Sequence, residues 1–399
     1  MKILVCNVGS TSLKYRLYES KGWKGIVQGK IERVGSQMSV FKCERGGSPA
    51  VERELPVPDY ESAVSFMISS LLASEGGPLD QIQEIAAVGF KVVHAKGITG
   101  VQFLDEDVIG AMEAYNSIAP AHNPPYITAI RIFAKLLPGT PLVGSFETGF
   151  HETMPRWAFL YGIPYEWYER YDVRRYGFHG ASHRYVSQRV SEILGTTTLR
   201  LISCHLGGSA SLCAVRDGKS IDTSLGFSLQ GGVEHSYRCG DIDPFIPLYM
   251  IEECGMSVAE VKRGLTNQGG LLGLSGISGD VRDLEEAAAV GNERARAALE
   301  VYSYGIKKYI GAYAAALGGV DAIAFAGGVG ENGVNVRARI CKGLEFLGVS
   351  LDPARNRVCG REAIISADDS RARVLVIPTN EELVVARQVT ELIAGGARR

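Results

Sequence analysis

A strand–turn–strand pattern that occurs twice, about half a chain apart, constrains the fold of this sequence more than any other feature. The first copy, residues 2–16, passes from an apolar run at 3–6 into a turn of small polar residues at 9–12. The second copy, residues 201–215, repeats the order of strand, cysteine, polar residue, glycine and small-residue turn. The pattern is typical of a β-hairpin, and its recurrence predicts a duplicated fold in which each half presents one such turn. Two unrelated hairpins of similar composition are the alternative.

Both turns contain hydroxyl side chains, backbone N–H groups and a glycine, a composition that suits contact with phosphate. A duplicated fold with one such turn in each half would suit a ligand that carries several phosphates. An ordinary hairpin turn without a ligand is the alternative interpretation of each copy.

Length and composition indicate a globular protein of two or three domains, since the 399 residues include 46% hydrophobic residues. The net charge of −2 gives no reason to expect nucleic acid or a membrane surface as a partner, and no apolar run reaches transmembrane length. The 8 cysteines are scattered without a C-x-x-C pair, which favours buried free thiols over disulfides or a metal site. A cytoplasmic location is therefore expected.

Apolar strands and helical segments alternate along the rest of the sequence, which predicts an α/β fold with helices covering mixed sheets. A boundary is expected near residue 150, which gives domains 1–150 and 151–383 and a closing helix, 384–399, that packs back on the first domain. The expected helices are 60–74, 107–118, 126–137, 184–194, 280–289 and 293–317. The expected strands after residue 60 are 85–93, 141–146, 201–215 as a hairpin, 322–326 and 374–378. Irregular loops are expected at 119–125, which contains three prolines, and at 269–279.

Two motifs have the composition of ligand-binding loops. The glycine-rich segment 327–333 follows an expected buried strand and opens a helix, a context that favours binding of a phosphate, ribose or base edge by backbone N–H groups. A simple strand–helix connection is the alternative, and the segment is not a P-loop. The segment 176–183 places two histidines and a serine at the entry to a helix, so that His179 could donate to a transferring phosphoryl group. Capping by Ser182 and a histidine packed in the core are the alternative.

Three charged positions have both a catalytic and a structural interpretation. Arg238 could stabilise charge on phosphoryl oxygens with its forked guanidinium, or form a surface salt bridge with Asp241. Glu381 and Glu382 could hold Mg²⁺ through water, or only favour the start of a helix through its dipole. Asp280 is equally consistent with a helix cap and with a ligand-binding role.

Taken together, these motifs resemble the acetate kinase family, within the sugar kinase, Hsp70 and actin superfamily. The resemblance covers essentially the whole chain and keeps the family's motif order. The matching stretches are residues 7–13, 92–94, 122–124, 176–183, 204–211, 222–227, 238–244, 275–282, 327–333 and 379–382. The resemblance implies a duplicated ribonuclease-H-like fold and a homodimer that transfers the γ-phosphoryl of ATP reversibly to a short carboxylate. It also implies a requirement for Mg²⁺, or Mn²⁺, and an acyl phosphate as product.

The resemblance further implies a role for individual residues of this chain. The catalytic residues would be Glu147, His179 and Arg238. The acid would contact Lys91, Val93, Ala121, His122, Phe178 and Leu229. The nucleotide, ATP or ADP, would contact Ser12, Lys14, His205, Gly207, Gly208, Ser209, Asp280, Val281, Arg282, Gly328, Gly330, Glu331 and Asn332. The metal ion would be bound by Asn7 and Glu381.

The departures from the family pattern lie mostly on the acid side. Lys91 stands where the family has arginine, Glu147 where it has aspartate, and Ala121 where it has leucine. Tyr237 is also expected near the acid. Two alternatives follow: a kinase for a larger acid such as propionate, butyrate or a hydroxy acid, and a nucleotide-binding paralogue with weak or no kinase activity. A sugar kinase is disfavoured because its aspartate base is not evident.

Overall fold

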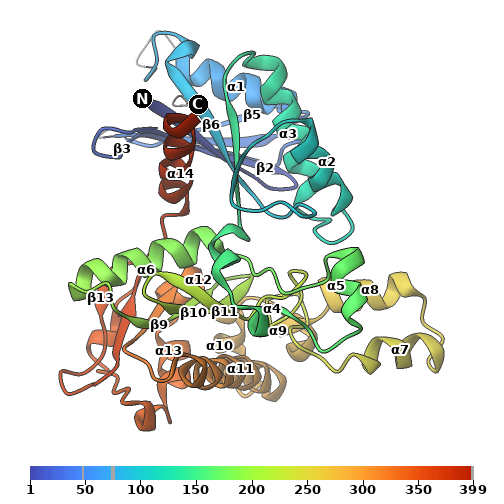
Figure 1. Ribbon diagram of the computed structural model, residues 1–399, viewed down its shortest axis with the longest axis vertical. Coiled ribbons are helices and arrows are strands. Elements are labelled where there is room, and N and C mark those ends of the chain that lie inside the picture. The colour runs from blue at the N-terminus through green and yellow to red at the C-terminus, as the bar shows by residue number, and fades with distance from the viewer. Residues whose placement is uncertain (47–48, 73–76, 397–399) are drawn as a thin grey trace. The chain divides into compact units, whose positions relative to one another are not determined.

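The computed structural model describes residues 1–46, 49–72 and 77–396, which form two compact units (Figure 1). Unit 1 consists of Met1–Gly149 and Asn380–Arg399, and unit 2 of Phe150–Thr379. Among the described residues, none of the helices has the length and apolar character needed to span a bilayer.

Unit 1 is built on a mixed sheet with the strand order β5-β4-β3-β2-β1-β6-β8-β7. Its strands are β1 (Lys2–Val8), β2 (Ser12–Glu19), β3 (Lys24–Glu32), β4 (Ser39–Arg45), β5 (Val51–Leu55), β6 (Ile85–Val92), β7 (Val101–Phe103) and β8 (Leu142–Phe146). Strands β1 to β5 form an antiparallel meander, whereas β6 runs parallel to β1 and β8 runs parallel to β6. The central strands are apolar on both faces because helices cover the sheet on both sides.

The helices of unit 1 are α1 (Tyr60–Leu72), α2 (Glu106–Ala114), α3 (Asn123–Leu136) and α14 (Glu381–Gly396). On one face, α14 packs so closely that a Cβ at Gly89 of β6 would lie 2.7 Å from a methyl group of Val389. The next residue of β6, Phe90, contacts Phe133 of α3 edge-to-face, with ring centroids 5.2 Å apart. Successive side chains of a strand point to opposite faces, so α3 and α14 cover opposite faces of the sheet.

Unit 2 contains a second mixed sheet, with the order β11-β10-β9-β12-β14-β13. Its strands are β9 (Arg200–Leu206), β10 (Ala210–Arg216), β11 (Lys219–Thr223), β12 (Ala322–Ala326), β13 (Ala363–Ile364) and β14 (Arg373–Val376). The long helix α11 (Glu293–Leu317) contributes to the apolar core on one face, and α6 (Gly180–Leu194) to the core on the other. The remaining helices are α4 (Arg156–Phe159), α5 (Tyr165–Tyr171), α7 (Phe245–Glu252), α8 (Val258–Asn267), α9 (Gly270–Ser275), α10 (Val281–Ala289), α12 (Gly327–Asn332) and α13 (Val334–Cys341). Short 3₁₀ helices lie at Ile82–Glu84, Gly149–Thr153, Glu345–Leu347 and Arg355–Arg357.

The centres of the two sheets repeat each other strand for strand. The order β3-β2-β1-β6-β8 in unit 1 corresponds to β11-β10-β9-β12-β14 in unit 2, with the same parallel and antiparallel pairs. The register also agrees, since Cys6 pairs with Phe90 and Cys204 pairs with Phe325. Each repeated sequence stretch therefore forms the hairpin that was predicted, at the same place in its own sheet.

Several local predictions differ from the structure. Helix α3 begins at Asn123 rather than at 126, and it includes Pro124 and Pro125 in its first turn. Proline is tolerated there because the first N–H groups of a helix have no partner within the helix. The glycine-rich segment 327–333 is itself mostly helical, as α12, and the expected loop 269–279 contains α9.

Candidate active site

The end of strand β6 in unit 1 carries a cation between two carboxylates. Lys91 Nζ lies 3.4 Å from Glu147 Oε1 and forms an ion pair with Glu381. Strand order explains the first contact, because β6 and β8 are parallel neighbours and Glu147 directly follows β8. Glu381 reaches the same point as the first residue of α14. Burial alone would lower the pKa of Lys91, but the charges of Glu381 and Glu147 outweigh this effect and raise it well above its usual value.

Asn7 lies next to this group, at the end of β1. Its Oδ1 accepts a hydrogen bond from the hydroxyl of Tyr126 in α3, at 2.9 Å. Burial raises the pKa of Tyr126, although the positive charge of Lys91 acts in the opposite direction. Tyr126 therefore stays a neutral donor that orients the amide of Asn7.

Asn7 and Glu381 offer an amide oxygen and a carboxylate, which are ligands that Mg²⁺ accepts. In the described part of the chain, no three His, Cys, Asp or Glu side chains gather into a possible metal-binding group. This fits Mg²⁺ bound with substrate phosphates, because such an ion takes one or two protein carboxylates and completes its shell with phosphates and water. The residues present therefore fit the metal that the family resemblance implies.

The other residues expected at the acid lie on two neighbouring segments of unit 1 and on two loops of unit 2. Val93 is buried just past β6, whereas Ala121 is exposed in the turn before α3. His122 directly precedes that helix. Phe178 is fully buried and Leu229 is nearly so.

His179 occupies the first position before α6, with a left-handed backbone at φ 58° and ψ 29°. Its Nδ1 lies 2.7 Å from the hydroxyl of Ser211 in β10. Its ring stacks on His205, with centroids 4.2 Å apart and planes at 30°. His205 Nδ1 in turn contacts the hydroxyl of Ser182, at 2.8 Å. Ser182 therefore fixes a second histidine of this cluster, which is a different role from the helix cap considered from the sequence.

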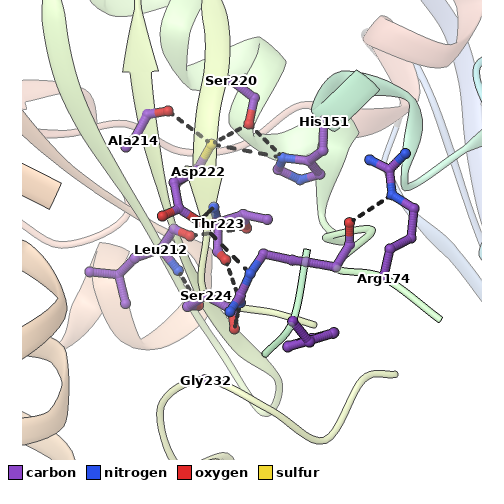
Figure 2. A network of polar contacts seen from close by, with 12 residues as sticks. His151, Arg174, Leu212, Ala214, Ser220, Asp222, Thr223, Ser224 and Gly232 are labelled. Carbon is purple, nitrogen blue, oxygen red and sulfur yellow. Dashed lines mark hydrogen bonds and ion pairs between the residues drawn. The ribbon is translucent and has the colours of Figure 1, made fainter. Parts of the chain in front are cut away.

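The segment before His179 is fastened to β11 by a network of polar contacts (Figure 2). Arg175 donates to the carbonyl oxygens of Thr223 and Ser224, at 2.9 and 3.1 Å. His151 bridges the hydroxyl of Ser220 and the carbonyl oxygen of Phe178, at 2.8 and 2.9 Å. Burial lowers the pKa of His151 to about 4, so its ring is neutral and donates to the carbonyl through Nε2–H.

Gly177 shows how tightly this segment approaches the strand. A Cβ at this position would lie 2.4 Å from a methyl carbon of Thr223, and the backbone has a φ of +77°. Both the space and the conformation require glycine there. The Tyr-Gly-Phe-His motif thus holds His179 in place by backbone geometry as well as by hydrogen bonds.

Arg238 contacts two residues, Ser209 and Leu229, that the sequence assigned to different substrates. Its guanidinium donates to Ser209 Oγ at 3.1 Å and to the carbonyl oxygen of Leu229 at 3.5 Å. Burial lowers the pKa of Arg238, yet an arginine keeps its charge in proteins. The carboxylate of Asp241 accepts hydrogen bonds from the N–H of Gly232 and from the hydroxyl of Tyr309.

A cavity of about 500 Å³ in unit 2 collects most of the predicted nucleotide residues. Those that line it are Gly207, Gly208, Asp280, Val281, Arg282, Gly328 and Asn332. Asp280 also caps α10 and forms an ion pair with Arg282 at 2.6 Å, so its structural and ligand-binding interpretations are compatible. The cavity gives this cluster the size and backbone N–H groups that a nucleotide requires.

Other predicted nucleotide residues support the cavity or lie elsewhere. Glu331 accepts hydrogen bonds from the N–H groups of Gly327 and Thr379, at 3.1 and 3.2 Å, and so ties α12 to the chain beyond β14. Gly330 is buried against Phe325 and Leu206. Ser12 and Lys14 belong to unit 1, where Lys14 lines a separate hollow of about 380 Å³.

Three lining residues of the nucleotide cavity, Ser236, Tyr237 and Glu285, were missing from the sequence assignment of the nucleotide site. Ser236 and Tyr237 directly precede Arg238, and Glu285 lies one helical turn after Arg282, on the same side of α10. The N–H of Ser236 donates to the carbonyl oxygen of Gly208 at 3.0 Å, which joins two segments that are distant in sequence. Tyr237, expected near the acid, is a wall of this cavity.

Comparison with known proteins gives a consistent assignment. A model of the acetokinase family matches residues 2–387. An acetate kinase from Carboxydothermus hydrogenoformans is 47% identical over 396 residues, which cover 98% of this chain and 99% of that protein. The crystal structure of Porphyromonas gingivalis acetate kinase matches with a TM-score of 0.89 and 39% identity, covering 98% of this chain and 99% of that chain. A propionate kinase from Francisella tularensis subsp. tularensis matches with a TM-score of 0.89 and 34% identity, covering 97% of this chain and 98% of that chain.

The structural matches confirm the predicted duplicated ribonuclease-H-like α/β fold with two mixed sheets flanked by helices. The acetate kinase relative is more similar in sequence than the propionate kinase, at 47% against 34% identity. The comparisons therefore do not favour the alternatives of a kinase for a larger acid or of a weakly active paralogue.

Proposed function

The chain belongs to the acetokinase family and is a carboxylate kinase of the acetate kinase type, and from this we propose a specific reaction and roles for its principal site residues. The reaction is reversible transfer of the γ-phosphoryl of ATP to a short-chain carboxylate, which gives an acyl phosphate and ADP. The observation that carries the proposal is the nucleotide-sized cavity of unit 2 with its glycine-lined and helix-terminal walls.

The cavity would hold ATP or ADP through backbone N–H groups of Gly207, Gly208 and Gly328. Asp280 and Arg282 would contact the nucleoside at the start of α10. Glu331 has a positioning role in this scheme, because its carboxylate holds the helix that carries Gly328.

Transfer of the phosphoryl group would depend on hydrogen-bond donors to the phosphoryl oxygens rather than on a general base. A carboxylate nucleophile is already ionised at neutral pH, so alignment and charge neutralisation are sufficient for catalysis. His179 and Arg238 are the groups assigned to the charge on the phosphoryl oxygens. The partly buried guanidinium of Arg238 is held by Ser209 and Leu229, which limits the freedom that it would lose during the reaction.

In unit 1, Lys91 is the cation that would bind the carboxylate of the acid. The residues that would surround the acid are Val93, Ala121 and His122. Lysine is a point charge and lacks the two-pronged geometry of arginine, so Glu147 and Glu381 are needed to fix its direction. Asn7 and Glu381 would hold Mg²⁺, which when bound neutralises phosphate charge.

We also propose that the enzyme is a homodimer and works in the cytoplasm. Helix α7 supports the dimer, because it has an apolar sequence but no buried residue, and Phe245 and Tyr249 are 73% and 60% exposed. An exposed apolar helix of this kind is typical of a protein interface. All eight cysteines are free thiols in the described chain, which is usual for a reducing compartment.

A hydroxamate assay of acyl phosphate formation from acetate, ATP and Mg²⁺ tests the function. Arg238→Ala should lower kcat by about 10²-fold or more and leave the KM for ATP nearly unchanged, as expected for loss of a charged donor to the transition state. Arg296→Ala, which removes an exposed arginine paired with Glu293, is the matched control. Glu381→Ala should shift the Mg²⁺ titration to higher concentration.

Each outcome of the assay addresses a separate assignment. If the wild-type protein forms no acyl phosphate, the proposed reaction is wrong. Near-normal turnover of Arg238→Ala would remove the role of that residue only, and an unchanged Mg²⁺ titration in Glu381→Ala would remove its role as a metal ligand.

A further inference from the structure

His179 stands at one end of a chain of buried hydroxyl and imidazole groups in unit 2. Its Nδ1 contacts Ser211 Oγ at 2.7 Å, and the same oxygen contacts His183 Nε2 at 2.8 Å. His183 Nδ1 contacts Ser203 Oγ at 2.9 Å. Ser203, His183 and Ser211 are fully buried, so water does not compete for these bonds. The groups come from β9, α6 and β10, and the fold brings them into one line.

The direction of this chain follows from its donors and acceptors. A neutral imidazole has one N–H and one acceptor nitrogen, so the two bonds of His183 run the same way. A serine oxygen can accept two hydrogen bonds, but if Ser211 accepted from both histidines its own buried hydrogen would have no acceptor among these groups, so the third bond runs the same way as well. If they ran toward Ser203, its own hydroxyl hydrogen would be buried without an acceptor, since His183 is its one hydrogen-bond partner in the described part of the chain. If they run toward His179, every hydrogen is used, and an unsatisfied buried donor is avoided.

The surroundings keep His183 neutral, as the hydrogen-bond directions described above require. Burial lowers the pKa of His183 well below its usual value, and the nearby His151 and His205 act in the same direction. His183 differs from His151, whose ring is fixed by a backbone carbonyl, because both of its partners are hydroxyl groups.

We propose that Ser203, His183 and Ser211 are positioning residues that keep the proton of His179 on Nε2. Ser203 donates to His183 Nδ1, His183 Nε2–H donates to Ser211, and the Ser211 hydroxyl donates to His179 Nδ1. An acceptor role for Nδ1 places the proton of a neutral His179 on the opposite nitrogen, which can then donate to a phosphoryl oxygen. The inference rests on the proposed role of His179 in phosphoryl transfer, and it adds residues that act through His179 without touching substrate.

The left-handed backbone of His179 explains why its ring needs support from Ser203, His183 and Ser211, which together are called the relay below. A non-glycine residue in that conformation is uncommon and persists where its surroundings hold it. The hydroxyl of Ser211 fixes the ring from one side and the stacked His205 from the other. Loss of the relay should therefore affect both the tautomer and the aim of the ring.

The test is nitrogen-15 NMR of the full-length protein with labelled histidine, because ring nitrogen shifts and two-bond couplings distinguish the tautomers. We expect His179 and His183 in the Nε2–H form in the wild type. Ser211→Ala should give His179 a mixture of tautomers and lower kcat by about 10- to 100-fold, as for loss of a group that orients a catalytic ligand, with an unchanged KM for ATP. Ser211→Thr, which restores a hydroxyl, should recover the Nε2–H form.

Two further variants keep the test decisive. Ser203→Ala removes the first donor of the relay and should give mixed tautomers at His183, even if Ser211→Ala does not fold. Ser187→Ala is the matched control, since it removes a nearly buried hydroxyl from α6, the helix of His183, that is not part of the relay. A proton on Nδ1 of His179, or unchanged tautomers and kcat in both relay variants, would overturn the inference. Normal turnover of His179→Gln would instead overturn the proposed role of His179, while the NMR result would still decide the relay.

Discussion

The substitution Lys91→Met removes the positive charge that lies between two carboxylates of unit 1 and nearly preserves the length of the side chain. Lys91 lies between Glu147 and Glu381, with 21% of its side chain exposed, against 5% and 14% for the two carboxylates. Without the ammonium group, two carboxylates would remain close together in a region with little access to water. We expect this change to destabilise unit 1 strongly.

The magnitude can be worked from the geometry. At 3.4 Å and an effective dielectric constant of ~20, the Lys91–Glu147 attraction alone is about 5 kcal/mol. The desolvation of the three groups offsets part of the attraction, but removing one partner of a buried pair leaves an uncompensated charge and typically costs about 3–5 kcal/mol. We therefore expect the free energy of unfolding of unit 1 to fall by about 3–5 kcal/mol at neutral pH.

The pH range of the effect follows from the sign of the pKa shift. The pKa of Lys91 is raised in the folded protein, so its contribution is complete below the ordinary lysine pKa of about 10.4 and is lost as the pH rises through the folded value. The difference between wild type and Lys91→Met should thus be constant from pH 7 to 9 and shrink only above about pH 10.4.

Tryptophan fluorescence can report on unit 1 alone. Trp23 is in unit 1, where the guanidinium carbon of Arg387 lies 5.7 Å from its ring centroid. In a background of Trp157→Phe and Trp167→Phe, which silences unit 2, urea titration then follows unit 1. Lys135→Met removes an exposed partner of Glu61 and is the matched control, with an expected change below about 1 kcal/mol.

A double substitution checks the cause. Lys91→Met combined with Glu381→Gln leaves one carboxylate instead of two and should be more stable than Lys91→Met alone. The reasoning is refuted if Lys91→Met changes stability no more than Lys135→Met does, or if the second substitution brings no recovery.

Two other predictions concern unit 2. Phe245→Glu combined with Tyr249→Glu should convert the proposed dimer into a monomer in sedimentation velocity, whereas Val290→Glu, at another exposed apolar residue, should not. A wild-type protein that is monomeric at micromolar concentration would contradict the proposed interface. Burial lowers the pKa of His235 and of His151 to about 4, and that of His183 well below its usual value. As the pH falls, these histidines therefore take up protons in the unfolded chain before they do so in the folded one. Unit 2 should lose stability below about pH 6.5 for this reason. The loss should reach about 4 kcal/mol per pH unit, and urea titrations that show a flat response from pH 6.5 to 4.5 would argue against three buried neutral histidines.

Strong periodic patterns allowed parts of the fold to be predicted closely from the sequence. Helix α11 and strand β12 have the predicted limits, because each is bounded by glycine or polar residues and has a regular burial pattern. The predicted start of α3 was wrong because proline was taken as a sign of irregular structure, although proline fits the first turn of a helix. The helical nature of 327–332 was not predicted because its three glycines have low helix propensity, and packing against β9 and β12 decides the conformation instead.

The site could be predicted as a set of residues but not as a set of contacts. The sequence assigned Lys91 to the acid and Glu381 to the metal ion, and it gave no sign of their ion pair, which joins residues 290 positions apart. Ser236 and Tyr237 were missed as nucleotide-cavity residues because a cavity wall is made by segments that approach one another only after folding. The sequence assigned Glu331 to the nucleotide together with its glycine-rich segment, and it gave no sign of the two backbone hydrogen bonds that the carboxylate accepts.

Equivalent positions of the two duplicated sheets, Asn7 and His205, have different hydrogen-bond partners because the helices next to them differ. Asn7 and His205 follow the equivalent cysteines of β1 and β9, so the repeated strand presents a polar side chain at the same point in both units. In unit 1 the partner at that point is the hydroxyl of Tyr126, from a helix that comes after β6. In unit 2 it is the hydroxyl of Ser182, from a helix that comes before β9. The sheet is therefore the duplicated part, while helices at different places in the two halves supply the hydroxyl that holds each position, which is Asn7, a proposed metal ligand, in unit 1 and His205, which stacks on His179, in unit 2.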